Sequence, residues 1–345
     1  MSVRGFSASR ILGAVILAGS FALGWLLMDF QSFLNTPLRG IDEPRSYVVA
    51  PGAGLIAVSR DLAARGHLEN PRFLVWYARW RGGADSIVAG EYQLRPGMLP
   101  AELLDQLTRG EVMRYTLTVP EGWTFRQLLT AVQRHDKITS LLPPGLSDEA
   151  IMAELGYPGE HPEGRFFPDT YQFISGTSDV TLLQRAHEAM EIRLQHAWSQ
   201  RTPDLPLATP YEALILASII EKETGAPEER ERIAGVFIRR LKLNMRLQTD
   251  PTVIYGLGEE YGGRLRTRDL RRDTPYNTYT RRGLPPTPIA LPGAESLMAA
   301  VNPQDGDEIF FVSRGDGTHY FSSTLETHER AVRKYQLGMS DEVLP

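Results

Sequence analysis

The chain contains no cysteine among its 345 residues. This absence excludes disulfide bonds, zinc sites with thiolate ligands and cysteine nucleophiles, but it leaves the cellular compartment open. Basic residues are also fewer than acidic ones: the chain has 37 Lys and Arg and 42 Asp and Glu, which gives a net charge of −5. A mildly acidic balance does not attract phosphate backbones, so we expect no nucleic-acid partner.

The usual signatures of cofactor and metal sites are missing as well. Gly256-Leu257-Gly258 lacks the third glycine of a dinucleotide-binding turn. His187-Glu188 lacks the second histidine of a zinc motif, and among the seven histidines only His319 and His328 fall in one compact region. We find no nucleophile elbow and no phosphate-binding loop. The sequence therefore predicts an activity without a metal and without a cofactor.

The overall composition is that of an ordinary folded protein, with 42% hydrophobic and 23% charged residues. Such proportions exclude a disordered chain, a collagen and a protein that crosses the membrane many times. At roughly 100 to 200 residues per domain, the length allows about two domains.

One uncharged apolar run stands near the N-terminus, from Ile11 to Met28. As a helix it spans about 27 Å, close to the thickness of a hydrocarbon core. Arg4 and Arg10 precede it and no basic residue follows until Arg39, which favours a cytoplasmic N-terminus. A cleaved signal peptide is the alternative, with Ala22-Leu23-Gly24 as a cleavage site, but its apolar part is usually shorter. We favour a single transmembrane helix.

The rest of the chain alternates short strands and helices, which indicates the α+β class. Gly90–Leu94 is typical of a strand, and Pro100–Thr108 of a helix that ends at Gly110. A small β-α-α-β module of this kind either binds a glycan or only holds the rest away from the membrane. A stretch rich in proline and glycine, residues 143–168, is expected to separate this region from a longer C-terminal part. Further helices are expected at residues 56–64, 73–80, 181–200, 210–224, 228–241 and 326–335, and strands at 115–119, 308–312 and 319–321.

The most informative segment is Thr209–Thr224, TPYEALILASIIEKET. Thr209 and Glu212 have the spacing of a capping box, which predicts a helix start. Only Ser218 interrupts the apolar residues 213–220, so we expect a helix that is buried on most sides.

Glu221 follows this buried segment directly. A carboxyl group that loses hydration at the end of a buried helix favours its protonated form, which suits a general acid. In the alternative interpretation, Glu221 and Glu223 only mark where the helix returns to solvent. The helix dipole disfavours acidic residues in a last turn, which counts against that alternative.

Two downstream segments, residues 246–256 and 274–280, are dense in amide, hydroxyl and tyrosine side chains. We expect loops there. Such loops suit sugars, which need several directed hydrogen bonds and a flat apolar surface. Turn formation alone would also explain their composition, so both interpretations stay open.

Several motifs together resemble those of the YceG-like endolytic murein transglycosylases. They are LASIIEKET, RLQTDPTVIYG, TPYNTYTRRGLPPTPI and HYFSSTLETHERAV, with EGRFFPDTYQF and GEYQLRPGM before them. The resemblance runs from the membrane helix to about Tyr335, and GEYQLRPGM is similar to the family's LysM-related module. The clearest departure is Arg165-Phe166, where the family's motif has more aromatic residues.

The resemblance implies an enzyme of the cell inner membrane whose periplasmic part cuts nascent peptidoglycan strands between N-acetylmuramic acid and N-acetylglucosamine. It implies 1,6-anhydro-N-acetylmuramyl ends, a role in setting strand length, and Glu221 as general acid and then base, with no assigned role for Glu223. One carboxyl group suffices, because the sugar's own C6 hydroxyl is the nucleophile. A hydrolytic muramidase would need Asp169 or Asp250 as a second catalyst. A wall-binding scaffold without activity is the third hypothesis.

Further expectations follow from the same resemblance. The implied partners are peptidoglycan glycan strands, peptidoglycan synthases of the penicillin-binding class, and the membrane. The implied parts are a cytoplasmic N-terminus (1–10), a transmembrane helix (11–29), a linker (30–46), a LysM-like module (47–118) and a catalytic domain (119–345). The expected substrate-binding residues are Asp169, Tyr171, Gln248, Thr249, Asp250, Tyr276, Asn277 and Tyr279.

Overall fold

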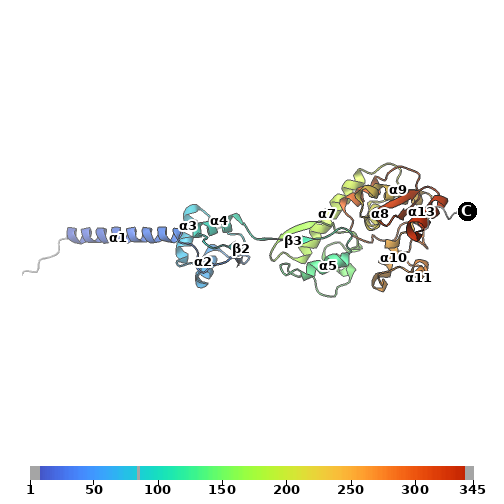
Figure 1. Ribbon diagram of the computed structural model, residues 1–345. Coiled ribbons are helices and arrows are strands. Elements are labelled where there is room, and N and C mark those ends of the chain that lie inside the picture. The colour runs from blue at the N-terminus through green and yellow to red at the C-terminus, as the bar shows by residue number, and fades with distance from the viewer. Residues whose placement is uncertain (1–7, 84–85, 339–345) are drawn as a thin grey trace, which may run out of the picture. The chain divides into compact units, whose positions relative to one another are not determined.

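The computed structural model describes residues 8–83 and 86–338, and its helices and strands are labelled in Figure 1. The chain divides into two compact units. The first comprises Met1–Tyr115 with Phe173–Gly176, and the second comprises Thr116–Gln172 with Thr177–Pro345. Helices and short two-stranded sheets occur in both units, as the α+β prediction requires.

The first unit begins with the long helix α1 (Ala8–Asn35), which continues into the segment predicted as a linker. Its span Ile11–Asn35 has a mean hydropathy of 2.2, and the most apolar part of it is not covered by other residues of the chain. Near its end, Phe30 and Phe33 pack edge-on against Phe73, with ring centroids 5.5 and 5.6 Å apart. The helix is therefore long and apolar enough to cross a membrane, and its C-terminal end is built into a folded core.

A strand-helix-helix-strand order follows, of which the sequence predicted both helices and the second strand but not the first strand. The two strands pair antiparallel, with Tyr47 opposite Tyr92. The Asn70 side chain caps the second helix by accepting a hydrogen bond from the backbone N–H of Arg72, which satisfies an amide at the helix start. The elements are β1 (Arg45–Val49), α2 (Leu55–Ala64), α3 (Pro71–Arg81) and β2 (Gly90–Leu94), followed by α4 (Pro100–Arg109).

The strands β3 (Arg114–Thr118) and β4 (Thr170–Ile174) pair with each other although they are far apart in the sequence. Between them lie α5 (Phe125–Arg134) and α6 (Asp148–Glu154). The prediction that residues 143–168 separate two regions was wrong, because this stretch lies inside the second unit. Its prolines and glycines form turns around α6, which buries Ile151 and Met152.

The core of the second unit surrounds α8 (Pro210–Glu223). Residues 213–220 of this helix are all buried, as predicted. Thr209 caps the helix by accepting from the Glu212 N–H at 3.2 Å, while the Glu212 carboxylate accepts from the Ala208 N–H. The helices that pack around α8 include α7 (Asp179–Ser199), α9 (Arg230–Lys242) and α12 (Ala294–Val301).

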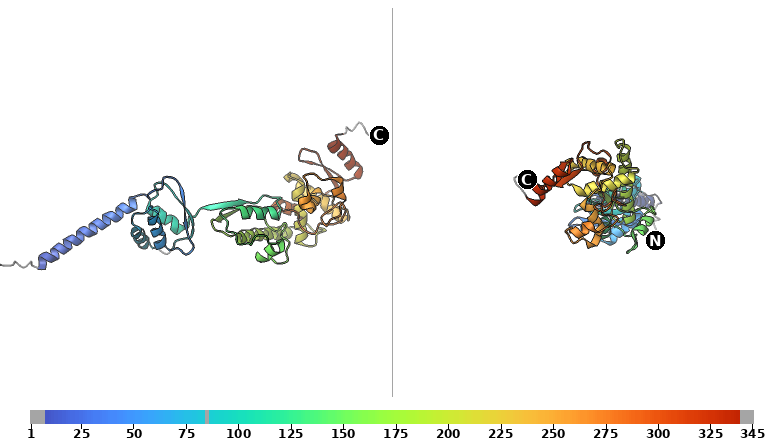
Figure 2. Two further views of the ribbon diagram at one scale, coloured as in Figure 1. Left: turned by 90° about the horizontal axis from the view of Figure 1, so that it is seen from below. Right: turned by 90° about the vertical axis from the view of Figure 1, so that its right-hand side faces the viewer.

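The segment after α9 differs from the loops that we expected, because residues 250–257 form the helix α10 (Asp250–Leu257). Pro251 occupies its first turn, where proline is tolerated, and Thr252 and Val253 are buried. The short helix α11 (Thr267–Arg271) follows. The hairpin of β5 (Phe310–Ser313) and β6 (His319–Ser322) packs against the last helix, α13 (Leu325–Leu337), drawn in red in Figure 2.

Glu163, in the EGRFFPDTYQF motif, is almost fully buried between two of these helices. Its carboxyl group accepts hydrogen bonds from the Phe125 N–H at the start of α5 and from the Tyr255 hydroxyl of α10. Burial raises the pKa of Glu163 to about 7, and the two hydrogen bonds only partly oppose that shift. The folded state therefore holds this proton more tightly than the unfolded chain does.

We expect this buried carboxyl group to make stability depend on pH. Because its pKa is higher in the folded protein, its contribution to stability is full below the ordinary value of 4.5 and is lost as the pH rises to about 7. In Glu163→Gln, the fall in the free energy of unfolding between about pH 4 and about pH 8 should be smaller than in wild type by up to about 3 kcal/mol. Urea unfolding of both proteins at about pH 4 and about pH 8 measures it; an equal loss in the variant would contradict the prediction.

Candidate active site

A cavity of about 430 Å³ opens in the second unit at the C-terminal end of α8. It is bordered by the segment before α10, by the β5–β6 hairpin and by α13. Charged, amide, phenol and imidazole groups line it beside aromatic and aliphatic side chains. The lining residues are Glu223, Arg240, Leu247, Gln248, Asp250, Tyr279, Phe310, Phe311, Val312, Ser313, His319, Leu325, His328, Val332 and Gln336.

Glu223, the last residue of α8, places its carboxyl group at this cavity. One oxygen accepts a hydrogen bond from the Thr249 hydroxyl. Burial raises the pKa of Glu223 to about 7; the Thr249 hydrogen bond lowers it, Asp250 raises it and Arg240 lowers it by smaller amounts. A carboxyl group with this pKa both holds and releases a proton near neutral pH, as an acid–base catalyst must.

Arg240 of α9 joins the segments around the cavity. Its guanidinium donates to the backbone carbonyls of Ile309 at 2.6 Å and Leu247 at 2.7 Å, and it lies 5.2 Å from the ring centre of Phe310. The side chain is buried, which lowers the pKa of Arg240. These bonds fix the segment that carries Gln248 relative to the start of β5.

Four of the predicted substrate-binding residues gather here. Gln248, Asp250 and Tyr279 line the cavity, and Thr249 holds Glu223. The Tyr279 hydroxyl donates to Asp250 Oδ1 at 2.6 Å. Burial, together with this bond to Asp250, raises the pKa of Tyr279, so the phenol keeps its proton. These four residues therefore lie together at one wall of the cavity, and their binding of substrate stays a prediction.

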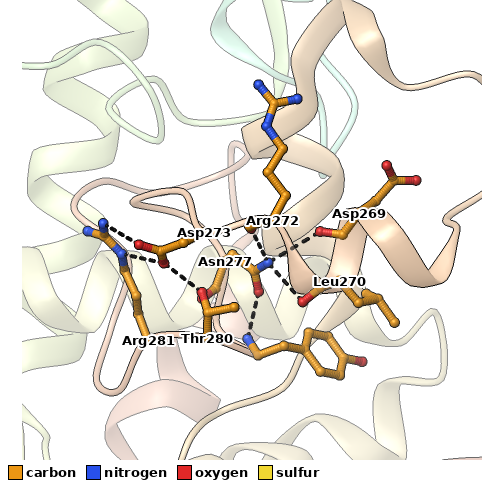
Figure 3. A network of polar contacts seen from close by, with 8 residues as sticks. Asp269, Leu270, Arg272, Asp273, Asn277, Thr280 and Arg281 are labelled. Atoms are coloured by element: carbon orange, nitrogen blue, oxygen red, sulfur yellow. Dashed lines mark hydrogen bonds and ion pairs between the residues drawn. The ribbon is translucent and has the colours of Figure 1, made fainter.

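Asn277 was predicted to bind substrate, but its amide is fully used within the protein. The side chain is 1% exposed; its Nδ2 donates to the carbonyls of Asp269, Leu270 and Arg272, and its Oδ1 accepts from the Tyr279 N–H (Figure 3). The structure therefore assigns Asn277 to the folding of the loop that carries Tyr279.

The remaining predicted binding residues also lie outside the lining of this cavity. Tyr171 is buried, and its hydroxyl donates to the Phe167 carbonyl at 2.5 Å. Asp169 is exposed and accepts from the N–H of the next residue at the start of β4. The Tyr276 hydroxyl lies 2.8 Å from Thr287 Oγ1. Each of these side chains has a local partner that fixes a turn or a loop.

Glu221 is not among the residues that line this cavity. Its Oε2 accepts from the Gly293 N–H at 3.0 Å and from Ser296 Oγ at 2.7 Å. Those groups belong to the start of α12, whose own cap residue, Gly293, has no side chain to offer. A carboxylate is favourable at a helix N-terminus, so α12 explains why an acidic residue is tolerated in the last turn of α8.

Further charged groups surround Glu221. Burial, and after it the charge of Glu221, raises the pKa of Glu121. Arg230 is mostly buried and bonds to Glu295, and its guanidinium lies 3.9 Å from the Glu121 carboxylate. Lys222 donates to the Gly122 carbonyl at 3.2 Å. This cluster joins the turn after β3 to the ends of α8 and α12.

Glu221→Ala is expected to destabilise the protein by about 1 to 2 kcal/mol, because the start of α12 loses its cap. Thermal unfolding measures the change. Glu154→Ala is the matched control, since Glu154 is an exposed acidic residue in the last turn of α6 and should change stability by less than about 0.5 kcal/mol. Equal effects of the two substitutions would contradict the capping role of Glu221.

Taken together, these features define a mixed helix-and-strand protein with one N-terminal apolar helix and a half-buried carboxyl group in a polar and aromatic cavity. Residues 47–334 match the model of the YceG-like family. The chain belongs to this family.

Known proteins similar to this chain carry related names. The endolytic murein transglycosylase of Bacillus subtilis is 29% identical over 337 residues, covering 93% of this chain and 91% of that protein. The endolytic murein transglycosylase of Streptococcus pneumoniae is 27% identical, and the alignment covers 96% of this chain but 65% of that protein. A crystal structure of a yceG-like protein from Listeria monocytogenes aligns with a TM-score of 0.53 at 29% identity, covering 84% of this chain and 99% of that one.

Proposed function

We propose that this chain is an endolytic peptidoglycan lytic transglycosylase. It cleaves glycan strands between N-acetylmuramic acid and N-acetylglucosamine and leaves 1,6-anhydro-N-acetylmuramyl ends, which would set strand length during wall synthesis. The names of its relatives support the substrate and the reaction class. The observation that carries the proposal is the half-buried carboxyl group of Glu223, which lies at the wall of a polar cavity and accepts a hydrogen bond from Thr249, and whose pKa burial raises to about 7.

We assign the acid–base role to Glu223 rather than to Glu221, the residue that the sequence indicated. Glu223 shares its cavity with Gln248, Asp250 and Tyr279, whereas Glu221 caps α12. Two residues along a helix correspond to a rotation of about 200°, so these neighbours face nearly opposite sides of α8. Of the two, only Glu223 lines this cavity.

The reaction then needs one proton to move twice. Protonated Glu223 gives its proton to the glycosidic oxygen as the C1–O bond of N-acetylmuramic acid breaks. The resulting carboxylate takes the proton of the C6 hydroxyl as that oxygen bonds to C1 and closes the anhydro ring. Glu223 ends protonated again, and no water enters the product.

A hydrolytic muramidase is the second candidate, and Asp250 is the observation that favours it. This carboxylate lines the same cavity as Glu223 and would have to activate a water molecule. However, its Oδ1 already accepts the Tyr279 hydroxyl at 2.6 Å. That bond fits a residue that orders the cavity wall better than a general base.

The first helix supports a proposed location of the enzyme in the membrane. We place α1 across the inner membrane, with the N-terminus in the cytoplasm, and the rest of the first unit and the whole second unit in the periplasm, where the glycan is made. Peptidoglycan synthases of the penicillin-binding class are the proposed partners there. The strand-helix-helix-strand part of the first unit is the proposed LysM-like module.

Mass spectrometry of digested glycan strands tests this function. The full-length protein, incubated with uncrosslinked strands, should release muramyl ends that are lighter by one water than reducing ends. Fully hydrated ends would support the muramidase instead. No cleavage at all would support a wall-binding scaffold.

A further inference from the structure

Two histidines stand in the wall of the Glu223 cavity. His319 comes from β6 and His328 from α13, and both belong to the motif HYFSSTLETHERAV, to which no role has been assigned above. Among the seven histidines, these are the two that fall in one compact region of the sequence. Their surroundings show what each ring can do.

His319 is held by the buried carboxylate of Glu229. Glu229 Oε2 lies 2.6 Å from His319 Nδ1, and Oε1 accepts the backbone N–H of the same histidine at 2.8 Å. The two side chains are only 10% and 12% exposed. A carboxylate accepts hydrogen bonds, so Nδ1 carries a proton, and this contact fixes the orientation of the ring.

Aromatic packing further restricts the His319 ring. It meets Phe311 edge-to-face, with centroids 5.4 Å apart and an interplanar angle of 89°, and Phe321 at 6.3 Å. A ring fixed by a carboxylate on one nitrogen and by packing around it presents its other nitrogen in one direction. Carboxylate–histidine pairs orient reactive imidazoles in this way in many enzymes.

His328 builds a flat surface in the same cavity. Its ring stacks on Phe310, with centroids 4.9 Å apart and an angle of 18°, and Arg240 lies 5.2 Å from the same phenyl ring. Burial, and after it the charge of Arg240, lowers the pKa of His328, so this ring stays uncharged at neutral pH. An uncharged flat surface suits the apolar side of a sugar ring.

We propose that His319, oriented by Glu229, is a substrate-contacting residue of the Glu223 cavity whose Nε2 forms a hydrogen bond with a sugar hydroxyl. The stacked rings of His328 and Phe310 pack against the same sugar, and Glu229 is a positioning residue. A hydroxyl group both donates and accepts, so it matches Nε2 in either protonation state of the ring. This inference rests on the proposed function, because it places a glycan in the cavity.

The test compares substitutions in the full-length protein acting on uncrosslinked glycan strands. His319→Gln and Glu229→Ala should each lower kcat/KM by about tenfold, mainly through KM, because a ground-state contact is lost. The double variant should lose no more kcat/KM than either single variant, because both substitutions break the same contact. His196→Gln, on the exposed surface of α7, is the control and should change nothing.

A binding measurement distinguishes a failure of this inference from a failure of the proposed reaction. In a Glu223→Gln background, which retains the cavity, His319→Gln should weaken binding of the strands about tenfold at an unchanged melting temperature. If wild type does not cleave, the proposed function fails, while this binding difference still tests His319. Equal binding with and without His319→Gln would overturn the inference. So would additive losses in the double variant.

Discussion

Glu223→Gln is expected to lower the rate of glycan cleavage by about 10² to 10⁴-fold, the range of a lost general acid–base catalyst. Glutamine keeps the size of the side chain and can still accept the hydrogen bond from Thr249, but it has no proton to give to the glycosidic oxygen. Release of anhydro-muramyl ends from uncrosslinked strands, followed by chromatography, measures the rate. Melting temperatures of both proteins show that the fold is retained.

Glu221→Gln provides the matched comparison, because it makes the same chemical change two residues away on the same helix. The amide oxygen still accepts from Gly293 and Ser296, so we expect activity within about threefold of wild type. The opposite result, an inactive Glu221→Gln beside an active Glu223→Gln, would return the catalytic role to the residue that the sequence indicated.

Phe237→Ala is expected to lower the free energy of unfolding of the second unit by about 3 to 5 kcal/mol. Phe237 of α9 is fully buried in the core around α8, and its ring meets Phe311 edge-to-face at 5.7 Å. Removing it loses apolar burial and leaves a void that close-packed neighbours cannot fill. For a unit of this size, the melting temperature should fall by roughly 8 to 16 °C.

Ile192→Ala is the control for this change. Ile192 is an apolar residue of α7 in the same unit, but it is 68% exposed, so its removal should cost less than about 0.5 kcal/mol. Thermal unfolding followed by circular dichroism compares both variants with wild type. A small effect of Phe237→Ala would mean that the core does not close around α8 as described.

Local signals explain why much of the fold could be predicted. The Thr209 cap and the unbroken apolar run after it specify α8 without help from distant residues. The same holds for β2, whose predicted bounds coincide with those observed, and for α4, which ends at Gly110 in a left-handed conformation.

Segments whose structure depends on tertiary contacts were predicted less well. The polar composition of the RLQTDPTVIYG motif indicated a loop, yet burial of Thr252 and Val253 stabilises α10. The proline- and glycine-rich stretch before β4 belongs inside a unit because β4 returns to pair with β3. The local sequence of either strand does not indicate pairing between strands so far apart in the chain.

The candidate site shows the same limit. The sequence predicted a catalytic region at the end of α8, where the cavity lies, and it predicted substrate binding by Gln248, Asp250 and Tyr279, which line that cavity. It indicated Glu221 as the acid, because the different directions of Glu221 and Glu223 on α8 acquire meaning only when α12 covers one side and the cavity opens on the other. The contribution of β6 and α13 to the cavity also depends on a contact between distant segments.

Cleavage in water labelled with heavy oxygen tests the central claim most directly. If Glu223 moves one proton twice and the sugar's own hydroxyl closes the ring, no oxygen from the solvent enters the product. Mass spectrometry should then find anhydro-muramyl ends without the label. Labelled reducing ends would contradict the account, because they would show that water attacks the sugar.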